Sequence, residues 1–235
     1  MFSIELCRVA IEIDNRFGFV ESLCKDYILK DEKRQPAFRV SVSLQEIRQY
    51  QASISRWMDD GEAESYLVYR AICGRMPAFG AYLLHAAVVY LDGRAYAFSA
   101  PRGQGKTTHT DMWESLLHAQ IINGDKPLIS VDSDGCVSAW GTPWCGKEGK
   151  QINTSVPLSG ICFLEKGQIN QIYALSVADA VSQMLLATML PPTQALQDGM
   201  AELIGKTLKA LPTYRLSCRP DSEAVMLSYR VMSKH

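Results

Sequence analysis

The stretch SAPRGQGKTTHTDMW, residues 99–113, decides how this chain is interpreted. It begins where an apolar run ends, and it passes into a segment of helical composition. Within it, Gly103 and Gly105 flank a single polar residue, and the tripeptide Lys-Thr-Thr (106–108) follows at once. A strand, a glycine-containing turn and a helix in that order are typical of a phosphate-binding loop.

Residues 100–107 nearly fit the pattern G-x-x-x-x-G-K-[ST], with Ala100 in place of the first glycine. Glycine can take positive φ, which allows successive backbone N–H groups to converge on an anion. The helix that follows adds its free N–H groups and the positive end of its dipole. Lys106 can reach a β- or γ-phosphate, and Thr107 can place its hydroxyl on Mg²⁺. The sequence therefore predicts that ATP and Mg²⁺ bind here.

The predicted nucleotide-binding residues are those of the loop and of the first helical turn. They are Ala100, Arg102, Gly103, Gln104, Gly105, Lys106, Thr107 and Thr108. Arg102 either adds a phosphate contact or is simply solvated. The plain alternative for the stretch is a glycine-containing loop before a helix that carries a surface lysine. We favour the phosphate site because the flanking strand, the flanking helix and Gly-Lys-Thr-Thr occur together.

Length and charge narrow the class of protein. The chain has 235 residues, of which 47% are hydrophobic and 21% charged, and this suits one soluble domain with a substantial core. The formal net charge is -1, so no basic field exists to attract nucleic acid. We expect a partner other than nucleic acid.

Cysteine usage and hydropathy indicate a cytoplasmic protein. None of the 7 cysteines forms a C-x-x-C pair, so zinc-ribbon and thioredoxin-like sites lack support. The first residues do not resemble a secretory signal, and no apolar run approaches the ~20 residues that span a bilayer. We therefore expect reduced thiols and no membrane partner.

Periodicity predicts a mixed α/β fold with antiparallel hairpins and flanking helices, rather than a regular series of βαβ units. Predicted strands cover 2–13, 37–44, 119–124, 159–167 and 213–218, and hairpins cover 85–100 and 127–141. Predicted helices cover 15–30, 44–58, 62–76, 108–118, 178–190 and 195–211, before a tail at 224–232. We expect an N-terminal α/β subdomain at 1–80 and a P-loop core at 81–235, packed as one compact unit.

Residues 83–108, LLHAAVVYLDGRAYAFSAPRGQGKTT, resemble the HPr kinase and phosphoenolpyruvate carboxykinase superfamily. Both families have a histidine-bearing strand, a turn, a second strand and then the glycine loop. After the loop helix they have a strand that ends in an acidic pair, where this chain has IINGDKPL (121–128). The likeness covers about 84–165. The C-terminal segment is similar to smaller kinase-like relatives that lie beside peptide-modification genes, and the first eighty residues match nothing.

The resemblance implies roles for individual residues. Lys106 and Thr107 match the phosphate and metal contacts of the loop, and Asp125 matches the second member of the acidic pair, a Mg²⁺ ligand or base. Gly124 stands where the first acid would be. The base is therefore Asp125 alone, or His85, or an oxygen that the acceptor itself brings ionised. For His85 the alternative is a structural residue on an apolar strand.

A second unusual stretch, WGTPWCGKEGKQIN at 140–153, is predicted to be a functional loop. Lys147 or Lys150 could stabilise a transferring phosphoryl group, and Trp140 and Trp144 could wall an acceptor site. The alternative is a tight turn with solvated lysines.

Several other residues receive a structural interpretation. Cys145 is expected to pack rather than react. His109 and Asp111 are expected to be exposed residues of the loop helix, and Asp132 and Asp134 to belong to a hairpin turn. The Met- and Leu-rich segment 179–205 is interpreted as core or as a subunit interface, which leaves homo-oligomerisation open.

These observations predict an HPr kinase-like phosphotransferase of the phosphoenolpyruvate carboxykinase-like P-loop fold. It would transfer the γ-phosphoryl group of ATP to a hydroxyl on a peptide, a protein (Ser or Thr) or a small molecule. Two alternatives stay open. One is a carboxykinase-like lyase, and the other, favoured by Ala100 and Gly124, is a non-catalytic nucleotide-binding module.

Overall fold

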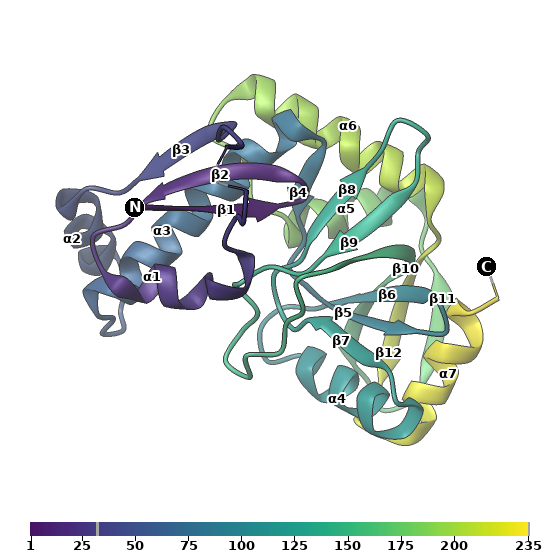
Figure 1. Cartoon of the computed structure of the whole chain (residues 1–235). Coiled ribbons are helices and arrows are strands. Elements are labelled where there is room, and N and C mark those ends of the chain that lie inside the picture. The colour runs from purple at the N-terminus through teal and green to yellow at the C-terminus, as the bar shows by residue number, and fades with distance from the viewer. Residues whose placement is uncertain (32, 235) are drawn as a thin grey trace.

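The computed structural model describes residues 1–31 and 33–234, and it shows a mixed α/β fold with two sheets (Figure 1). The smaller sheet has the order β1-β2-β3, in which β1 and β2 are antiparallel and β2 and β3 are parallel. Its strands are β1 (Phe2–Leu6), β2 (Val9–Asp14) and β3 (Phe38–Ser41). The helices beside it are α1 (Gly18–Leu23), α2 (Leu44–Ser53) and α3 (Asp60–Arg75), with 3-10 turns at Lys25–Tyr27 and Met76–Phe79.

The larger sheet carries the glycine loop. Its path is β4-β8-β9-β10-β6-β5-β7, and β12 pairs with β10 and with β11. Its strands are β4 (Ala81–Leu83), β5 (Ala86–Leu91), β6 (Arg94–Ser99), β7 (Gln120–Asn123), β8 (Leu128–Val131), β9 (Val137–Trp140), β10 (Ser155–Lys166), β11 (Gln171–Ala174) and β12 (Thr213–Cys218). Its helices are α4 (Lys106–Leu117), α5 (Val177–Ala187), α6 (Gln194–Ala210) and α7 (Ser222–Met232).

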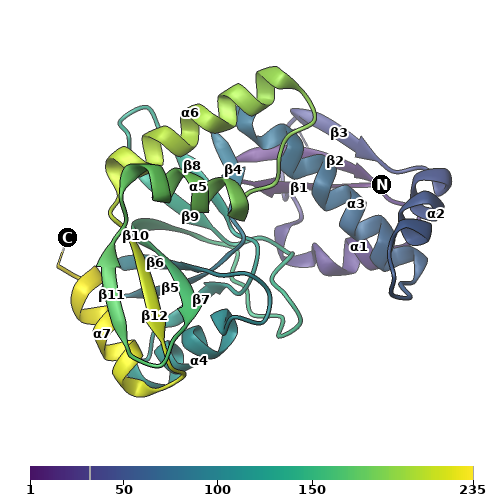
Figure 2. The same ribbon diagram turned by 180° about the vertical axis from the view of Figure 1, so that it is seen from behind.

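Helices cover both faces of this sheet (Figures 1 and 2). On one face, Met184 of α5 and Leu203 of α6 join a buried cluster with Val88 and Ile161. On the other face, residues of α4 and α7 pack with a second cluster that contains Tyr96, Phe98 and Trp113. The alternating strands thus bury side chains in both directions, and the loop between β6 and α4 lies at one end of this layered core.

Strand β10 joins the two parts of the larger sheet. Its first residues pair antiparallel with β9, at Ser155 to Pro157. Further along, it pairs in parallel with β6 on one side and with β12 on the other. The strand that precedes the glycine loop is therefore held in the middle of the sheet.

The structure confirms both predicted hairpins. Strands β5 and β6 pair antiparallel around Asp92 and Gly93, whose φ angles of 52° and 82° suit a tight two-residue turn. In the β8–β9 hairpin, the Asp132 carboxylate accepts hydrogen bonds from the backbone N–H groups of Asp134 and Cys136. Asp132 therefore serves the turn.

Several predicted elements are wrong in extent or type, and one of them is the helix at 44–58, which ends at Ser53 as α2. The single strand at 2–13 is two strands, because Cys7 and Arg8 take φ of 49° and 63° and reverse the chain. The helix at 15–30 is reduced to α1 and a 3-10 turn. The tail is helix α7, which begins where Asp221 caps the N–H of Ala224.

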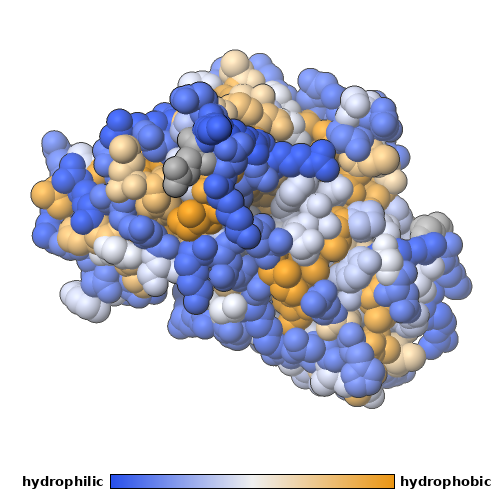
Figure 3. All heavy atoms as spheres, in the orientation of Figure 1, coloured by the Kyte–Doolittle hydropathy of each residue, from blue (hydrophilic) through white to orange (hydrophobic). Residues whose placement is uncertain are grey.

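The surface seen in the orientation of Figure 1 is mainly hydrophilic, with hydrophobic residues showing in separate patches (Figure 3). Among the described residues, no helix combines the length and the apolar composition needed to cross a membrane. The division of the chain at residue 80 stays a prediction. Polar contacts cross that position, because Tyr27 donates to Gln151 and Trp144 donates to Ser65.

Candidate functional site

The glycine loop has the backbone that the sequence predicts. Gly103 and Gly105 have φ of 79° and 97°, in the left-handed region that favours glycine. No atom lies within 4 Å of a Cβ built on either residue, so the backbone conformation and not crowding requires glycine here. Ala100 is buried in the core behind the loop, and Arg102 is exposed.

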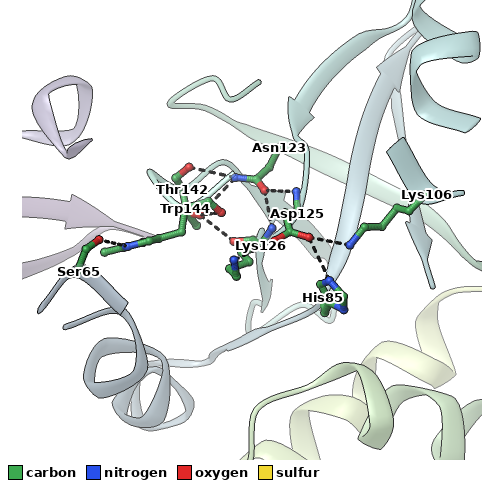
Figure 4. A network of polar contacts seen from close by, with 8 residues as sticks. All are labelled: Ser65, His85, Lys106, Asn123, Asp125, Lys126, Thr142 and Trp144. Atoms are coloured by element: carbon green, nitrogen blue, oxygen red, sulfur yellow. Dashed lines mark hydrogen bonds and ion pairs between the residues drawn. The ribbon is translucent and has the colours of Figure 1, made fainter. Parts of the chain in front are cut away.

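Lys106, the first residue of α4, points into the protein toward the end of a neighbouring strand. Its Nζ lies 2.8 Å from Oδ1 of Asp125, and its side chain is only 10% exposed. Burial lowers the pKa of this ammonium, and the contact with Asp125 opposes that effect. Two residues that the sequence places nineteen positions apart therefore form one ion pair (Figure 4).

The Asp125 carboxylate accepts from three cationic or imidazole side chains. His85 Nε2 lies 3.0 Å from Oδ1, beside Lys106, and Lys126 Nζ lies 2.9 Å from Oδ2. Burial alone would raise the pKa of this carboxyl, but the hydrogen bonds from His85, Lys106 and Lys126 outweigh burial and hold it well below its usual range. Asp125 is therefore ionised at neutral pH.

The buried side chain of Asn123 holds the turn that carries Asp125 and Lys126. Asn123 ends β7, and its Oδ1 accepts from the backbone N–H groups of Asp125 (3.0 Å) and Lys126 (2.7 Å). Its Nδ2 donates to the carbonyl oxygen of Thr142, 3.0 Å away. The turn after β7 is thus locked to the following loop, and Asp125 and Lys126 are presented together.

The structure leaves no space for a side chain at position 124. A Cβ on Gly124 would lie 2.7 Å from the carbonyl oxygen of Cys145. A Cβ on Gly146 would lie 3.3 Å from Cβ of Asp125, so the loop packs on Asp125 as well. Residues 140–153 therefore occupy the space in which a first acidic side chain would begin.

Both tryptophans of this loop are engaged in packing. Trp144 is buried, stacks at a tilt on Tyr69 with 5.3 Å between ring centroids, and donates to Ser65 Oγ at 3.1 Å. Trp140 is half-buried and donates to Ser130 Oγ at 2.8 Å. For Trp144 the structure favours the alternative of a tight, packed turn, because its ring fills the contact between the loop and α3. Cys145 is buried too, and burial raises the pKa of its thiol, in keeping with packing.

The two candidate lysines of the loop differ in their surroundings. Lys150 Nζ is paired with Asp111 (2.8 Å) and Glu114 (2.6 Å) of α4. Lys147 is exposed, and within the described part of the chain no carboxylate lies within ion-pair distance of it. Lys147 is therefore the lysine of this loop that is free to meet an anion.

The expectation that His109 is exposed is wrong. It is 2% exposed, with Phe98 edge-on at 4.8 Å, and its Nε2 accepts from Trp113 Nε1 at 3.1 Å. Burial lowers its pKa to about 4. Because α4 turns once every 3.6 residues, His109 and Trp113 share the face that packs on the sheet. Asp111 lies on the outer face, where Lys150 reaches it.

Lys126 is the residue that the sequence analysis missed. It directly follows Asp125, and a lysine beside an acid in sequence carries no pattern that marks it as part of a site. The structure alone shows that its ammonium turns back to Oδ2 of Asp125.

The candidate metal ligands are the Thr107 hydroxyl and the Asp125 carboxylate. Among residues 1–31 and 33–234, no group of three or more His, Cys, Asp and Glu side chains is arranged to hold a metal ion. Cavities of about 410 Å³ and 330 Å³ lie elsewhere, beside Trp57 and beside Tyr214. We place the functional site at the loop because ionisable groups converge there, whereas the larger cavity is an open surface hollow.

Comparisons with known proteins add little to this geometry. No family model matches the chain, and no curated protein matches it. Among solved structures, the HPr(Ser) kinase/phosphatase from Coxiella burnetii is a weak neighbour, with a TM-score of 0.37 and 8% identity over 65% of this chain and 95% of that one. A likeness at this level does not decide family or function.

Proposed function

We propose that this chain is a P-loop kinase of the HPr kinase-like type, with a phosphoenolpyruvate carboxykinase-like core. It binds ATP at residues 100–108 and transfers the γ-phosphoryl group to a hydroxyl on a peptide, a protein or a small molecule. One observation carries the proposal: Lys106, placed by the glycine loop at the start of α4, meets Asp125 at the end of β7, with His85 beside them.

The loop would hold the phosphates through its backbone. The positive φ of Gly103 and Gly105 and the free N–H groups of the first turn of α4 supply donors that cost little reorganisation when an anion binds. Lys106 would add a mobile cation once it exchanges its carboxylate partner for a phosphate oxygen. Such positioning and charge neutralisation account for most of phosphoryl-transfer catalysis.

Magnesium fits the oxygen donors of the site. A hydroxyl and a carboxylate are hard ligands of the kind that Mg²⁺ takes in phosphate sites, and Thr107 and Asp125 supply them. The ion would neutralise charge on the phosphates when bound. Asp125 would have to exchange one of its ammonium partners for the metal, because both of its oxygens are engaged.

We assign the role of base to His85. The ionised Asp125 carboxylate can only accept, so Nε2 of His85 would be the donor and Nδ1 would be the nitrogen that takes a proton. The carboxylate orients the ring and would stabilise the charge that forms when Nδ1 takes the proton of the acceptor hydroxyl. Asp125 is itself a weak base, since its pKa lies well below the usual range.

A non-catalytic nucleotide-binding module is the second candidate. It is favoured by the packing of Cys145 on Gly124, which removes the space for a second carboxylate. The two candidates differ in turnover and not in ATP binding.

The test combines ATP binding with label transfer from γ-labelled ATP to Ser- and Thr-containing peptides, including the products of neighbouring genes. Lys106→Ala is expected to lower transfer on the order of 100-fold or more, as for one lost charged contact to the transition state. Lys209→Ala, an exposed lysine of α6, is the matched control and should leave transfer unchanged. Tight ATP binding without transfer to any hydroxyl would support the non-catalytic module.

A further inference from the structure

Two ammonium groups contact the single carboxylate of Asp125. Lys106 and Lys126 both bring an ammonium within 3 Å of the one carboxylate, on Oδ1 and Oδ2 respectively. The two ammonium groups and the one carboxylate together carry a net charge of about +1. One ammonium is therefore surplus for neutralising Asp125.

Lys126 is held in place by contacts other than its carboxylate partner. Its backbone N–H donates to Asn123, and its carbonyl oxygen accepts from Thr142 Oγ1 at 2.7 Å. Its ammonium lies 5.6 Å from the ring centroid of Tyr69, a cation–π distance. Tyr69 belongs to α3 and is itself fixed by its contact with Trp144.

We propose that Lys126 is a positioning residue that releases Lys106: it stays on Asp125 when Lys106 leaves the carboxylate for the phosphates of a nucleotide. The inference rests on the proposed nucleotide site. It also gives helix α3 a role in the site, because Tyr69 of α3 keeps the Lys126 ammonium at Oδ2 of Asp125. The N-terminal residues that match no known pattern would thereby complete the phosphate site.

The physical reason lies in the burial of Asp125. Its side chain is only 21% exposed, and a partly buried carboxylate is destabilised when it loses its last ammonium partner. Without Lys126, Lys106 would be the only ammonium on Asp125, and a phosphate would have to compete for it. With Lys126 in place, Asp125 keeps a counter-ion, so Lys106 can turn to the phosphates at small cost.

A double-mutant cycle tests this role. ATP affinity is measured in EDTA, so that metal binding at Asp125 does not enter, for the wild type, Lys126→Met, Asp125→Asn and the double variant. We expect Lys126→Met to weaken ATP binding about tenfold and Asp125→Asn alone to change it less than about threefold. In the Lys126→Met background, Asp125→Asn should restore most of the lost affinity, because nothing then retains Lys106.

Additive effects in the cycle would overturn the proposal, since they would mean that Lys126 acts only through its own charge on the phosphates. Lys126→Arg should retain ATP affinity close to that of the wild type, and a loss equal to that of Lys126→Met would also count against it. Lys126→Gln serves in the cycle if the methionine variant is insoluble. Failure of the proposed function is distinct: the wild type would then bind no ATP, or Lys106→Ala would bind it equally well.

Discussion

The carbonyl oxygen of Cys145 lies 2.7 Å from the position that a Cβ on Gly124 would occupy. This contact leaves no space for a side chain at position 124, in the turn after β7. The position belongs to the packing of the 140–153 loop, and that packing also places Gly146 against Asp125. The need for glycine at position 124 and the close packing of the loop thus have the same structural cause.

An acidic side chain placed at position 124 should therefore not be accommodated. Gly124→Asp must push the Cys145 carbonyl away, so we expect a loss of about 2 kcal/mol in the free energy of unfolding and no gain in phosphoryl transfer. Urea denaturation measures the loss. Gly205→Ala in α6, where a Cβ meets no atom within 4 Å, is the matched control and should be neutral or stabilising. A stable and more active Gly124→Asp protein would contradict this account of the turn.

The left-handed backbone of Gly105 should be required for ATP binding. At φ 97° an alanine is strained by about 1–3 kcal/mol, although its methyl group has open space around it. Gly105→Ala should relax the turn and redirect its N–H groups, which lowers ATP affinity by roughly tenfold or more. Isothermal titration measures the affinity. Unchanged affinity would mean that the phosphates do not use this turn.

The two lysines of the 140–153 loop should differ in how much their substitution lowers kcat. Lys147 has no carboxylate partner within the described residues, whereas Lys150 is engaged by Asp111 and Glu114. If a loop cation meets the transferring phosphoryl group, Lys147→Met should lower kcat by about tenfold or more, and Lys150→Met by less than about threefold. A larger loss of kcat in Lys150→Met than in Lys147→Met would mean that Lys150 is the cation that meets the phosphoryl group. Stability should change little in either variant, because Lys147 is exposed and the ion pairs of Lys150 are with solvent-exposed carboxylates.

Stability should depend on pH through His109. In the folded protein burial lowers its pKa from 6.5 to about 4, and protonation would place a hydrogen on Nε2 against the Trp113 N–H. The unfolded chain binds this proton at higher pH than the folded chain does. The contribution of His109 to the free energy of unfolding is therefore complete above pH 6.5. It is lost as pH falls toward 4, by about 3 kcal/mol in total.

Urea denaturation between pH 7 and pH 4 checks this effect. His109→Gln, which keeps a polar side chain beside Trp113, should be less stable than the wild type at pH 7 and should lose less stability on acidification. If the two proteins lose stability in parallel as pH falls, the lowered pKa of His109 is contradicted.

Local signals were sufficient for the parts of the fold that local chemistry determines. Asp92-Gly93 predicts a tight turn wherever it occurs between β-rich runs, and Gly-Lys-Thr-Thr predicts a helix start with a lysine at its first turn. The reversal at Cys7 and Arg8 was missed because neither is a residue that usually takes positive φ. In α7, Asp221 before Ser222 is an N-cap signal that could have identified the helix.

The site was predictable only in part, for a physical reason. Lys106 and Asp125 stand in recognisable positions after a glycine turn and after an apolar strand. The roles of Lys126 and Tyr69 depend on α3 packing against the 140–153 loop, which is a contact between distant segments. His109 was misjudged although it lies one helical turn before Trp113, and that spacing could have placed both side chains on the buried face of α4.

Because β10 is paired with a strand on each side, its central residues should be protected from local unfolding. Ile161 to Phe163 have β6 on one side and β12 on the other, so no fraying edge or local loop motion exposes their amides. Deuterium should enter these positions only when the whole chain unfolds, and their exchange rates would report global stability directly.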